Sequence, residues 1–326
     1  MYLQFLRENS WKQCQRVHLG ESSQVYSSKI GDELSDNFLK KNLGSWLFIL
    51  PILLIHLLVV ALPAISTMYL SMTDWSGVGV PHFTGLTNIK RLLFDDDNFI
   101  SALKNNIRWL AFFLTIPFVM SLAAAYGLSQ IRRGVMFYRI SLFLPYILPS
   151  VVVGALWRFI LNPSSGFTGF LDNLGVPGFD KALLGTSETA LWTIAFIDNW
   201  HFWGFLTILF LVALQNVPRE LYESAELDGA NEFQRFRYVA LPGIRPTLVF
   251  MLMMVGIWSF LVFDYVWVLT KGGPAGSTEV LGTLVYRTAF GDFEAGYATL
   301  QGLGMAFFAS ASLVSFAILR KRGWEI

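Results

Sequence analysis

The sequence has little charge, almost no cysteine and few histidines. Only 47 of its 326 residues are Asp, Glu, Lys or Arg, which is 14%, against roughly 25% in an average soluble domain. The net charge of +1 leaves no long-range field for a polyanion, so a nucleic-acid binder is excluded. The single cysteine, Cys14, excludes a disulfide framework. The four histidines never cluster with it at the spacing of metal ligands, so we expect no metal site.

What the chain has instead is apolar sequence in long uncharged runs. Hydrophobic residues make up 54% of it, and about 20 helical residues cross the ~30 Å core of a bilayer. Because backbone groups in lipid must be paired within their own segment, such runs form helices. We therefore predict an all-α integral membrane protein with six transmembrane helices. The runs are 42–73, 109–131, 140–157, 189–218, 246–270 and 295–319, the fourth and fifth each interrupted by one Asp.

Lys and Arg are distributed unevenly over the segments between these runs. If the N-terminus is inside, segments 1–44, 130–139, 215–246 and 320–326 face the cytoplasm and carry sixteen of the 24 basic residues. Cytoplasmic loops are enriched in Lys and Arg, so the bias predicts an N-in/C-in topology. No signal peptide is visible. We expect a cytoplasmic tail over 1–42 and a six-helix domain over 43–326, multi-pass in the cytoplasmic (inner) membrane.

The cytoplasmic loop 215–246 is polar but patterned. Pro218 suits the first turn of a short helix running to about Leu227. Gly229 suits a left-handed cap that ends this helix, and Asn231 can cap a second one. A helix, a glycine turn and a helix form a shape that can insert into a groove on a partner. An ordinary amphipathic loop packed on its own membrane domain is the alternative, and the pattern alone leaves both open.

The same loop carries a motif. The run Glu223-Ser224-Ala225-Glu226-Leu227-Asp228-Gly229, followed by Val239-Ala240-Leu241-Pro242, resembles the EAA loop of ABC importer permeases, with matching spacing to Gly229 and Pro242. Ser224 replaces the middle Ala and Val239 replaces Ile, and both changes are conservative. The segments Thr270-Lys271-Gly272-Gly273-Pro274 and Gly296-Tyr297-Ala298 look like the carbohydrate-uptake branch, the maltose and glycerol-phosphate type. The resemblance covers roughly residues 43–321.

The resemblance implies a type I ABC importer permease fold and a division of labour between subunits. The implied partners are a second permease subunit, two ATP-binding subunits and an extracytoplasmic solute-binding protein. The implied site of coupling to the ATPases consists of Glu223, Ser224, Ala225, Asp228, Gly229 and Pro242. ATP and Mg²⁺ are used by the partners, and no cofactor is expected in this chain. The sequence has no Gly-x-x-x-x-Gly-Lys-Ser/Thr run, so we expect a transport subunit and not an enzyme.

Two acids, Asp198 and Asp264, lie within the predicted spans. Ionisable groups at membrane depth are costly and usually line a bundle interior or an aqueous path. Carboxylates can bind sugar hydroxyls, while aromatic faces cover the apolar side of a sugar ring. We therefore take Asp264, Asp198, Tyr265 and Trp203 as candidates for the substrate path. A position near the outer interface, among the ordinary aromatic belt, is the alternative.

The run Asp95-Asp96-Asp97 precedes the second apolar run, on the outer side of the predicted topology. Short acidic runs between helices are usually solvated. We expect an ordinary solvated loop here.

The function that we expect is ATP-driven import of a carbohydrate or polyol by a permease subunit. An ABC permease for a non-sugar substrate is one alternative. An ion-coupled secondary transporter of a small polar solute is another, but such proteins often show inverted repeats, and no internal repeat is obvious. An intramembrane enzyme would need paired catalytic groups at depth, and each span supplies only one acid.

Overall fold

The computed structural model describes residues 47–131, 133–176 and 182–321. The tail expected over 1–42 lies outside the described residues. Most described residues are helical, and the β-structure among them is a single isolated bridge between Thr73 and Phe83. The chain divides into two compact units, residues 1–66 and 67–326. The described part of the first unit is one helix that contains a π-helical turn.

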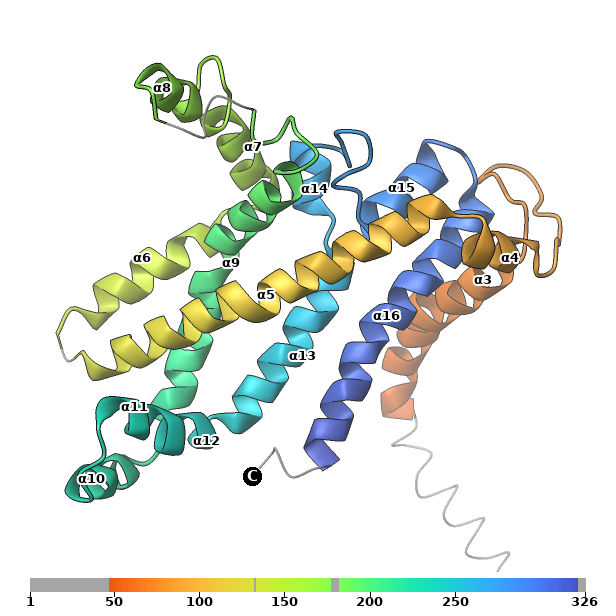
Figure 1. Cartoon of the computed structure of the whole chain (residues 1–326). Coiled ribbons are helices and arrows are strands. Elements are labelled where there is room, and N and C mark those ends of the chain that lie inside the picture. Colours follow the sequence, from red (N-terminus) through yellow and green to blue (C-terminus); the bar gives the residue numbers. More distant parts are fainter. Residues whose placement is uncertain (1–46, 132, 177–181, 322–326) are drawn as a thin grey trace, which may run out of the picture. The chain divides into compact units, whose positions relative to one another are not determined.

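Figure 1 shows the order of the helices along the chain. In chain order they are η1 (Leu57–Ala61), α3 (Leu62–Leu70), α4 (Thr87–Phe94), α5 (Asp97–Gln130), α6 (Val135–Ile147), α7 (Ser150–Ile160), α8 (Phe167–Asn173), α9 (Ala190–Gln215), α10 (Arg219–Leu227), α11 (Glu232–Arg235), η2 (Phe236–Ala240), α12 (Leu241–Gly243), α13 (Arg245–Leu261), α14 (Asp264–Leu269), α15 (Leu281–Phe290) and α16 (Ala295–Lys321).

Five helical segments in the described part of the chain are long and apolar enough to cross a membrane. They are Leu47–Leu70, Asp97–Gln130, Ala190–Gln215, Arg245–Leu269 and Ala295–Lys321. The third expected span differs from the prediction because it is not one continuous helix. α6 and α7 meet the same criterion only together, and they are bent by 94° at the break between them. The count of six spans therefore holds when this bent pair is taken as one.

The bend has a local cause in the sequence. Pro149 has no backbone N–H, and its ring disfavours the helical conformation of the residue before it. Leu148 is accordingly extended, with a ψ of 138°, and α7 starts directly after Pro149. The uncharged run 140–157 thus consists of two helices, although its length and composition suggest one.

α9 is the central helix of the second unit. In its most apolar 18-residue window 56% of the residues are buried, a larger share than in the other continuous spans. Apolar residues cover every side of the helix, as expected where other helices surround it. α5 is its main neighbour, and Phe118 of α5 meets Phe210 of α9 edge to face with ring centroids 5.1 Å apart. The fully buried residues of α9 include Ile194, Ile197, Leu206 and Phe210.

α6 packs against α9 at Gly204. A Cβ atom on Gly204 would collide with the backbone carbonyl of Leu142 on α6. The two helix backbones therefore approach each other more closely than a side chain would allow. Small residues have this role in membrane helix packing, where van der Waals contact replaces the hydrophobic effect as the force between helices.

The fifth span is also broken, between α13 and α14. Val262 and Phe263 leave the helical conformation, so the last carbonyls of α13 lose their helical partners. Asn106 of α5 compensates, since its Nδ2 donates to the Ser259 carbonyl at 2.8 Å and its Oδ1 accepts from the Leu281 N–H at 2.8 Å. One buried amide of α5 thus ties the end of α13 to the start of α15.

The start of α5 is held by Asp96, which corrects the expectation of a solvated loop at this position. The Asp96 carboxylate accepts hydrogen bonds from the Phe99 N–H at 2.8 Å, the Tyr297 hydroxyl at 2.6 Å and Gln301 at 3.1 Å. Burial opposes its ionisation, but these bonds and the charge of Arg91 hold the pKa of Asp96 below its ordinary value. The carboxylate therefore stabilises the α5–α16 contact at neutral pH, and this contribution is lost only as the pH falls through the lowered pKa.

The ends of the helices fit the predicted topology. α10, α11 and α12 and the end of α16 lie on one side of the second unit, while α7, α8, α14 and α15 reach toward the other (Figure 1). The basic segments 215–246 and 320–321 therefore fall on one side. We call this the cytoplasmic side and the opposite one the outer side, following the N-in/C-in prediction.

The contact at Gly204 generates a prediction about stability. We expect Gly204→Ala to lower stability by about 1–3 kcal/mol, because the new methyl group must push α6 away from α9. Gly127→Ala in α5 is the matched control, since a Cβ there meets nothing within 4 Å. It should be neutral or slightly stabilising. Thermal unfolding in detergent measures both, and equal midpoints for the two variants would contradict the close approach at Gly204.

Candidate functional site

A cavity of about 490 Å³ lies among the broken helices of the second unit. Four helices supply most of its wall, namely α5, α9, α13 and α14, and α6 and α7 contribute one lining residue each. The side chains that line it are Trp109, Phe113, Tyr146, Ser150, Asp198, His201, Phe202, Val255, Trp258, Ser259, Asp264 and Tyr265. We call it the central cavity. Its carboxyl, serine and imidazole groups come from α7, α9, α13 and α14 and converge on one space.

Three of the four candidates for the substrate path meet in this cavity. Asp198 projects from α9, Asp264 is the first residue of α14, and Tyr265 follows it. The Asp264 carboxylate accepts a hydrogen bond from the Ser150 hydroxyl at 2.7 Å. The Tyr265 hydroxyl is buried and finds no hydrogen-bond partner within the part of the chain that the structure describes. A buried donor without a partner is unfavourable, so a ligand hydroxyl at this position would be stabilised.

His201 lies one helical turn after Asp198 on α9, and it contacts the bend between α6 and α7. Its Nε2 is 3.0 Å from the Leu148 carbonyl oxygen. Because a carbonyl only accepts, this bond requires the proton on Nε2. Leu148 lies between the two helices, so its carbonyl is outside both helical ladders, and His201 supplies the missing donor.

Aromatic rings form much of the remaining wall. Tyr146 stacks on Phe205 with ring centroids 4.4 Å apart, and Phe202 meets Trp258 edge to face at 5.2 Å. Trp109 and Phe113 stack on each other at 5.6 Å on the α5 side. These packed rings give the cavity rigid apolar faces beside its carboxylates and hydroxyls.

The fourth candidate, Trp203, does not line the cavity. It lies on α9, and its backbone carbonyl accepts hydrogen bonds from Ser121 of α5 at 2.8 Å and from Thr207 at 2.9 Å.

The lining residues Ser150, Tyr146 and Trp258 were not among the sequence candidates. Ser150 follows a Leu-Pro pair, and Pro149 was the available sign that a helix begins there and exposes a hydroxyl at its start.

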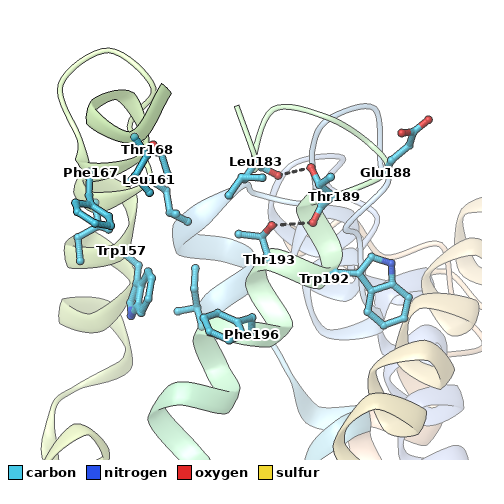
Figure 2. A pocket seen from close by; sticks show the side chains of 13 residues that line it. Trp157, Leu161, Phe167, Thr168, Leu183, Glu188, Thr189, Trp192, Thr193 and Phe196 are labelled. Carbon is cyan, nitrogen blue, oxygen red and sulfur yellow. Dashed lines mark hydrogen bonds between the residues drawn. The ribbon is translucent and has the colours of Figure 1, made fainter. Parts of the chain in front are cut away.

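A second cavity, of about 590 Å³, lies at the outer ends of α7, α8 and α9 (Figure 2). Trp157, Phe167, Trp192 and Phe196 give it a largely apolar wall. Its threonine hydroxyls donate hydrogen bonds to backbone carbonyls of the protein: Thr189 donates to Leu183 at 2.7 Å, and Thr193 donates to Thr189 at 2.9 Å. Glu188 lies at the rim with its carboxylate pointing away (Figure 2). This cavity therefore lacks the convergent polar groups of the central cavity.

The patterned loop 215–246 forms the helix, glycine turn and helix expected of it. α10 begins directly after Pro218, and Gly229 has the left-handed φ of +79° that suits glycine. Asn231 caps α11 reciprocally with Gln234. The Asn231 side chain accepts from the Gln234 N–H at 2.9 Å, and the Gln234 side chain accepts from the Asn231 N–H at 2.8 Å.

The loop is anchored to α5 through Tyr126. The Tyr126 ring meets Phe236 with centroids 4.8 Å apart, and its hydroxyl donates to Glu232 oxygens at 3.1 and 3.2 Å. Arg235 joins the two short helices, because it pairs with Glu226 of α10 at 3.3 Å and with Glu232 of α11. The turn is therefore held as a unit against the cytoplasmic end of α5.

The opposite face of the loop is uncovered. Glu223, Ser224, Asp228 and Gly229 are exposed, while Ala225 and Pro242 are partly buried. Apolar side chains are exposed as well, among them Leu227, whose exposed fraction is 90%, and Phe233. Exposed apolar residues rimmed by charge mark protein-interaction surfaces.

A bundle of spanning helices with a polar central cavity and an exposed helical loop on one side is typical of a membrane transport subunit. The family model for the binding-protein-dependent transport system inner membrane component matches residues 117–322, and the chain belongs to this family. It is therefore a multi-pass inner-membrane permease subunit of an ABC importer.

Relatives and solved structures agree with this family. A diacetylchitobiose uptake system permease protein of Streptomyces coelicolor is 33% identical over 267 residues, covering 78% of this chain and 75% of that protein. The trehalose/maltose transport system permease protein of Thermococcus litoralis is 32% identical over 265 residues, covering 78% and 86%. A chain of the bacterial alginate ABC transporter, crystallised with an alginate pentasaccharide-bound periplasmic protein, matches with a TM-score of 0.77 at 23% identity. It covers 90% of this chain and 98% of that one, which establishes the type I permease fold.

The anchor of the loop generates a second prediction. Tyr126→Phe keeps the ring on Phe236 but removes both bonds to Glu232. We expect faster amide hydrogen exchange over residues 219–243, equivalent to at most about 1 kcal/mol of lost protection, because the hydroxyl is partly solvated. Tyr238→Phe, at an exposed tyrosine of the same segment, is the control and should leave exchange unchanged. Identical exchange in the two variants would show that the Tyr126 hydroxyl does not hold the loop.

Proposed function

We propose that this permease subunit imports a carbohydrate and that the sugar passes through the central cavity. Relatives that cover most of the chain are permease proteins for diacetylchitobiose, for trehalose and maltose, and for starch degradation products. The observation that carries the proposal is the convergence of Asp198, Asp264 and Tyr265 with aromatic faces in one space.

The chemistry of the cavity suits a sugar better than an ion or an apolar solute. Carboxylates accept hydrogen bonds from neighbouring sugar hydroxyls, and aromatic rings pack on the C–H faces of a pyranose. Two acids and one tyrosine give few strong contacts, so the sugar is held only loosely. Loose binding suits a transport path, in which the substrate must also leave.

Replacing the acids tests this proposal. Asp198→Ala and Asp264→Ala should each raise the KM for uptake up to about ten-fold, because each removes a hydrogen bond to the sugar worth about 0.5–1.5 kcal/mol. Uptake is measured in proteoliposomes of the complete transporter with its binding protein, using radiolabelled trehalose, maltose and diacetylchitobiose. Asp172→Ala on α8, at an exposed acid outside the central cavity, is the control. Unchanged kinetics in both cavity variants, or no uptake of any sugar by the wild type, would refute the proposal.

The proposal includes a coupling role for the loop 215–246. Glu223, Ser224, Ala225, Asp228, Gly229 and Pro242 form or support the surface that engages an ATP-binding subunit, which uses ATP and Mg²⁺. The exposed face around α10 and its anchor to α5 support this assignment, because a coupling element must present a surface and transmit force.

The complete importer contains a second permease subunit, two ATP-binding subunits and an extracytoplasmic solute-binding protein. The exposed apolar residues of α16, such as Phe307 and Val314, leave area for lipid or for the second permease.

A matched pair of glycines tests the coupling role. Gly229 and Gly134 both have positive φ, +79° and +76°, and a Cβ at either meets nothing within 4 Å. Gly229→Val and Gly134→Val therefore carry similar backbone strain, about 1–2 kcal/mol. We expect only Gly229→Val to reduce uptake, by at least ten-fold, and to weaken co-purification of the ATP-binding subunits. Wild-type uptake with normal association in Gly229→Val would remove the coupling assignment.

A further inference from the structure

Two spans are broken at neighbouring points beside the central cavity. The third span bends between α6 and α7 at Leu148 and Pro149, and the fifth is interrupted between α13 and α14 at Val262 and Phe263. We call residues 147–150, where α6 gives way to α7, the elbow. Tyr146, which precedes the elbow, and Ser150, its last residue, both line the cavity.

The two arms of the elbow pack on different helices. α6 packs along α9, where Gly204 admits the Leu142 carbonyl, while α7 packs mainly on α14. α9 carries Asp198, and α14 carries Asp264. The elbow therefore lies between the two helices that bring the acids into the cavity.

One hydrogen bond holds each side of the elbow. On the α9 side, His201 Nε2 donates to the Leu148 carbonyl at 3.0 Å. On the α14 side, the Ser150 hydroxyl donates to the Asp264 carboxylate at 2.7 Å. Ser150 is the first residue of α7, so the partial positive charge of that helix end also favours the Asp264 carboxylate. The chain of contacts runs from α9 through the elbow to α14 without a gap.

We propose that His201 and Ser150 are positioning residues for substrate binding. They hold the elbow so that Asp264 faces Asp198 at the separation that the sugar requires. The inference rests on the proposed function, since it takes both acids as sugar ligands. Neither His201 nor Ser150 needs to contact the sugar, because each acts through the group to which it is bonded.

The position of α9 gives the elbow a second consequence. α9 ends at Gln215, and α10 of the coupling loop begins at Arg219. A displacement of α10 therefore reaches α9 directly, and His201 is the point where α9 is bonded to the elbow. The position of the coupling loop and the affinity for the sugar are then linked through α9, the His201–Leu148 bond and the Ser150–Asp264 bond.

The test compares variants that remove the donor with variants that keep it, in the complete transporter. His201→Met and Ser150→Ala remove the donors, whereas His201→Gln and Ser150→Thr keep an N–H or O–H at similar reach. Uptake of the best-transported sugar of the trehalose, maltose and diacetylchitobiose panel is measured in proteoliposomes. We expect the two donor-deleting variants to raise KM five- to ten-fold, with a smaller change in maximal rate, and the two conservative variants to stay within two-fold of wild type. Ser165→Ala, at an exposed serine outside the cavity, is the control.

A double-mutant cycle separates positioning from direct contact with the sugar. If Ser150 acts through Asp264, Ser150→Ala should raise KM no further in the Asp264→Ala background. A full additional effect in that background would mean that Ser150 binds the sugar itself, and the inference would be overturned. Because Ser150→Ala removes one atom, this cycle remains decisive even if His201→Met does not fold.

The outcome also distinguishes this inference from the proposed function. Raised KM in Asp198→Ala and Asp264→Ala, with unchanged KM in His201→Met and Ser150→Ala, would leave the sugar path in place and overturn the elbow. Unchanged KM in all four variants would overturn both.

Discussion

The rest of the structure depends on one constraint, which is that backbone polar groups within a bilayer must find partners inside the protein. A continuous helix meets it unaided, but a broken helix does not. Among the described residues two spans are broken, and each break is matched by a particular side chain from a neighbour. Asn106 donates a hydrogen bond to the Ser259 carbonyl at the end of α13, and His201 donates one to the Leu148 carbonyl in the bend of the third span. The positions of these polar residues, and hence of the central cavity, follow from where the helices are interrupted.

The constraint also explains why the cavity is polar where its surroundings are not. An acid at the start of a helix segment is less costly than one in the middle, because a neighbouring helix end and a hydroxyl can stabilise it. Asp264 has this position, next to Ser150 at the start of α7. Aromatic rings that stack on one another keep the rest of the wall rigid without adding polar groups. The cavity thus presents a few polar groups that are held in place by packed apolar side chains.

The sequence predicted the features that depend on local pattern, and it missed those that depend on contacts between distant segments. Uncharged runs located the spans, and Pro218, Gly229 and Asn231 predicted α10, its turn and the cap of α11, because each acts on its own backbone. The 94° bend was missed since the run 140–157 has the length and composition of one helix, although Pro149 lay within it. Asp96 was expected in a solvated loop, but Tyr297 and Gln301, some 200 positions away, hold it.

Contacts between distant segments also limited the prediction of the cavity. Both acids were chosen as candidates for their rarity at membrane depth, whereas Ser150 became a candidate only once α7 was seen beside α14.

The anchor at Tyr126 has a mechanical consequence. The loop is continuous with α9 at one end and with α13 at the other, and it is bonded to α5, so it is attached to three helices that contribute to the main buried core. If α10 engages an ATP-binding subunit as we propose, a force on α10 therefore passes to α9, α5 and α13. α16 is little buried and packs on α13 and α15, so such a force would reach α16 through those helices. The proposed coupling loop is thus attached to α9, the most buried of the continuous spans in the described part of the chain.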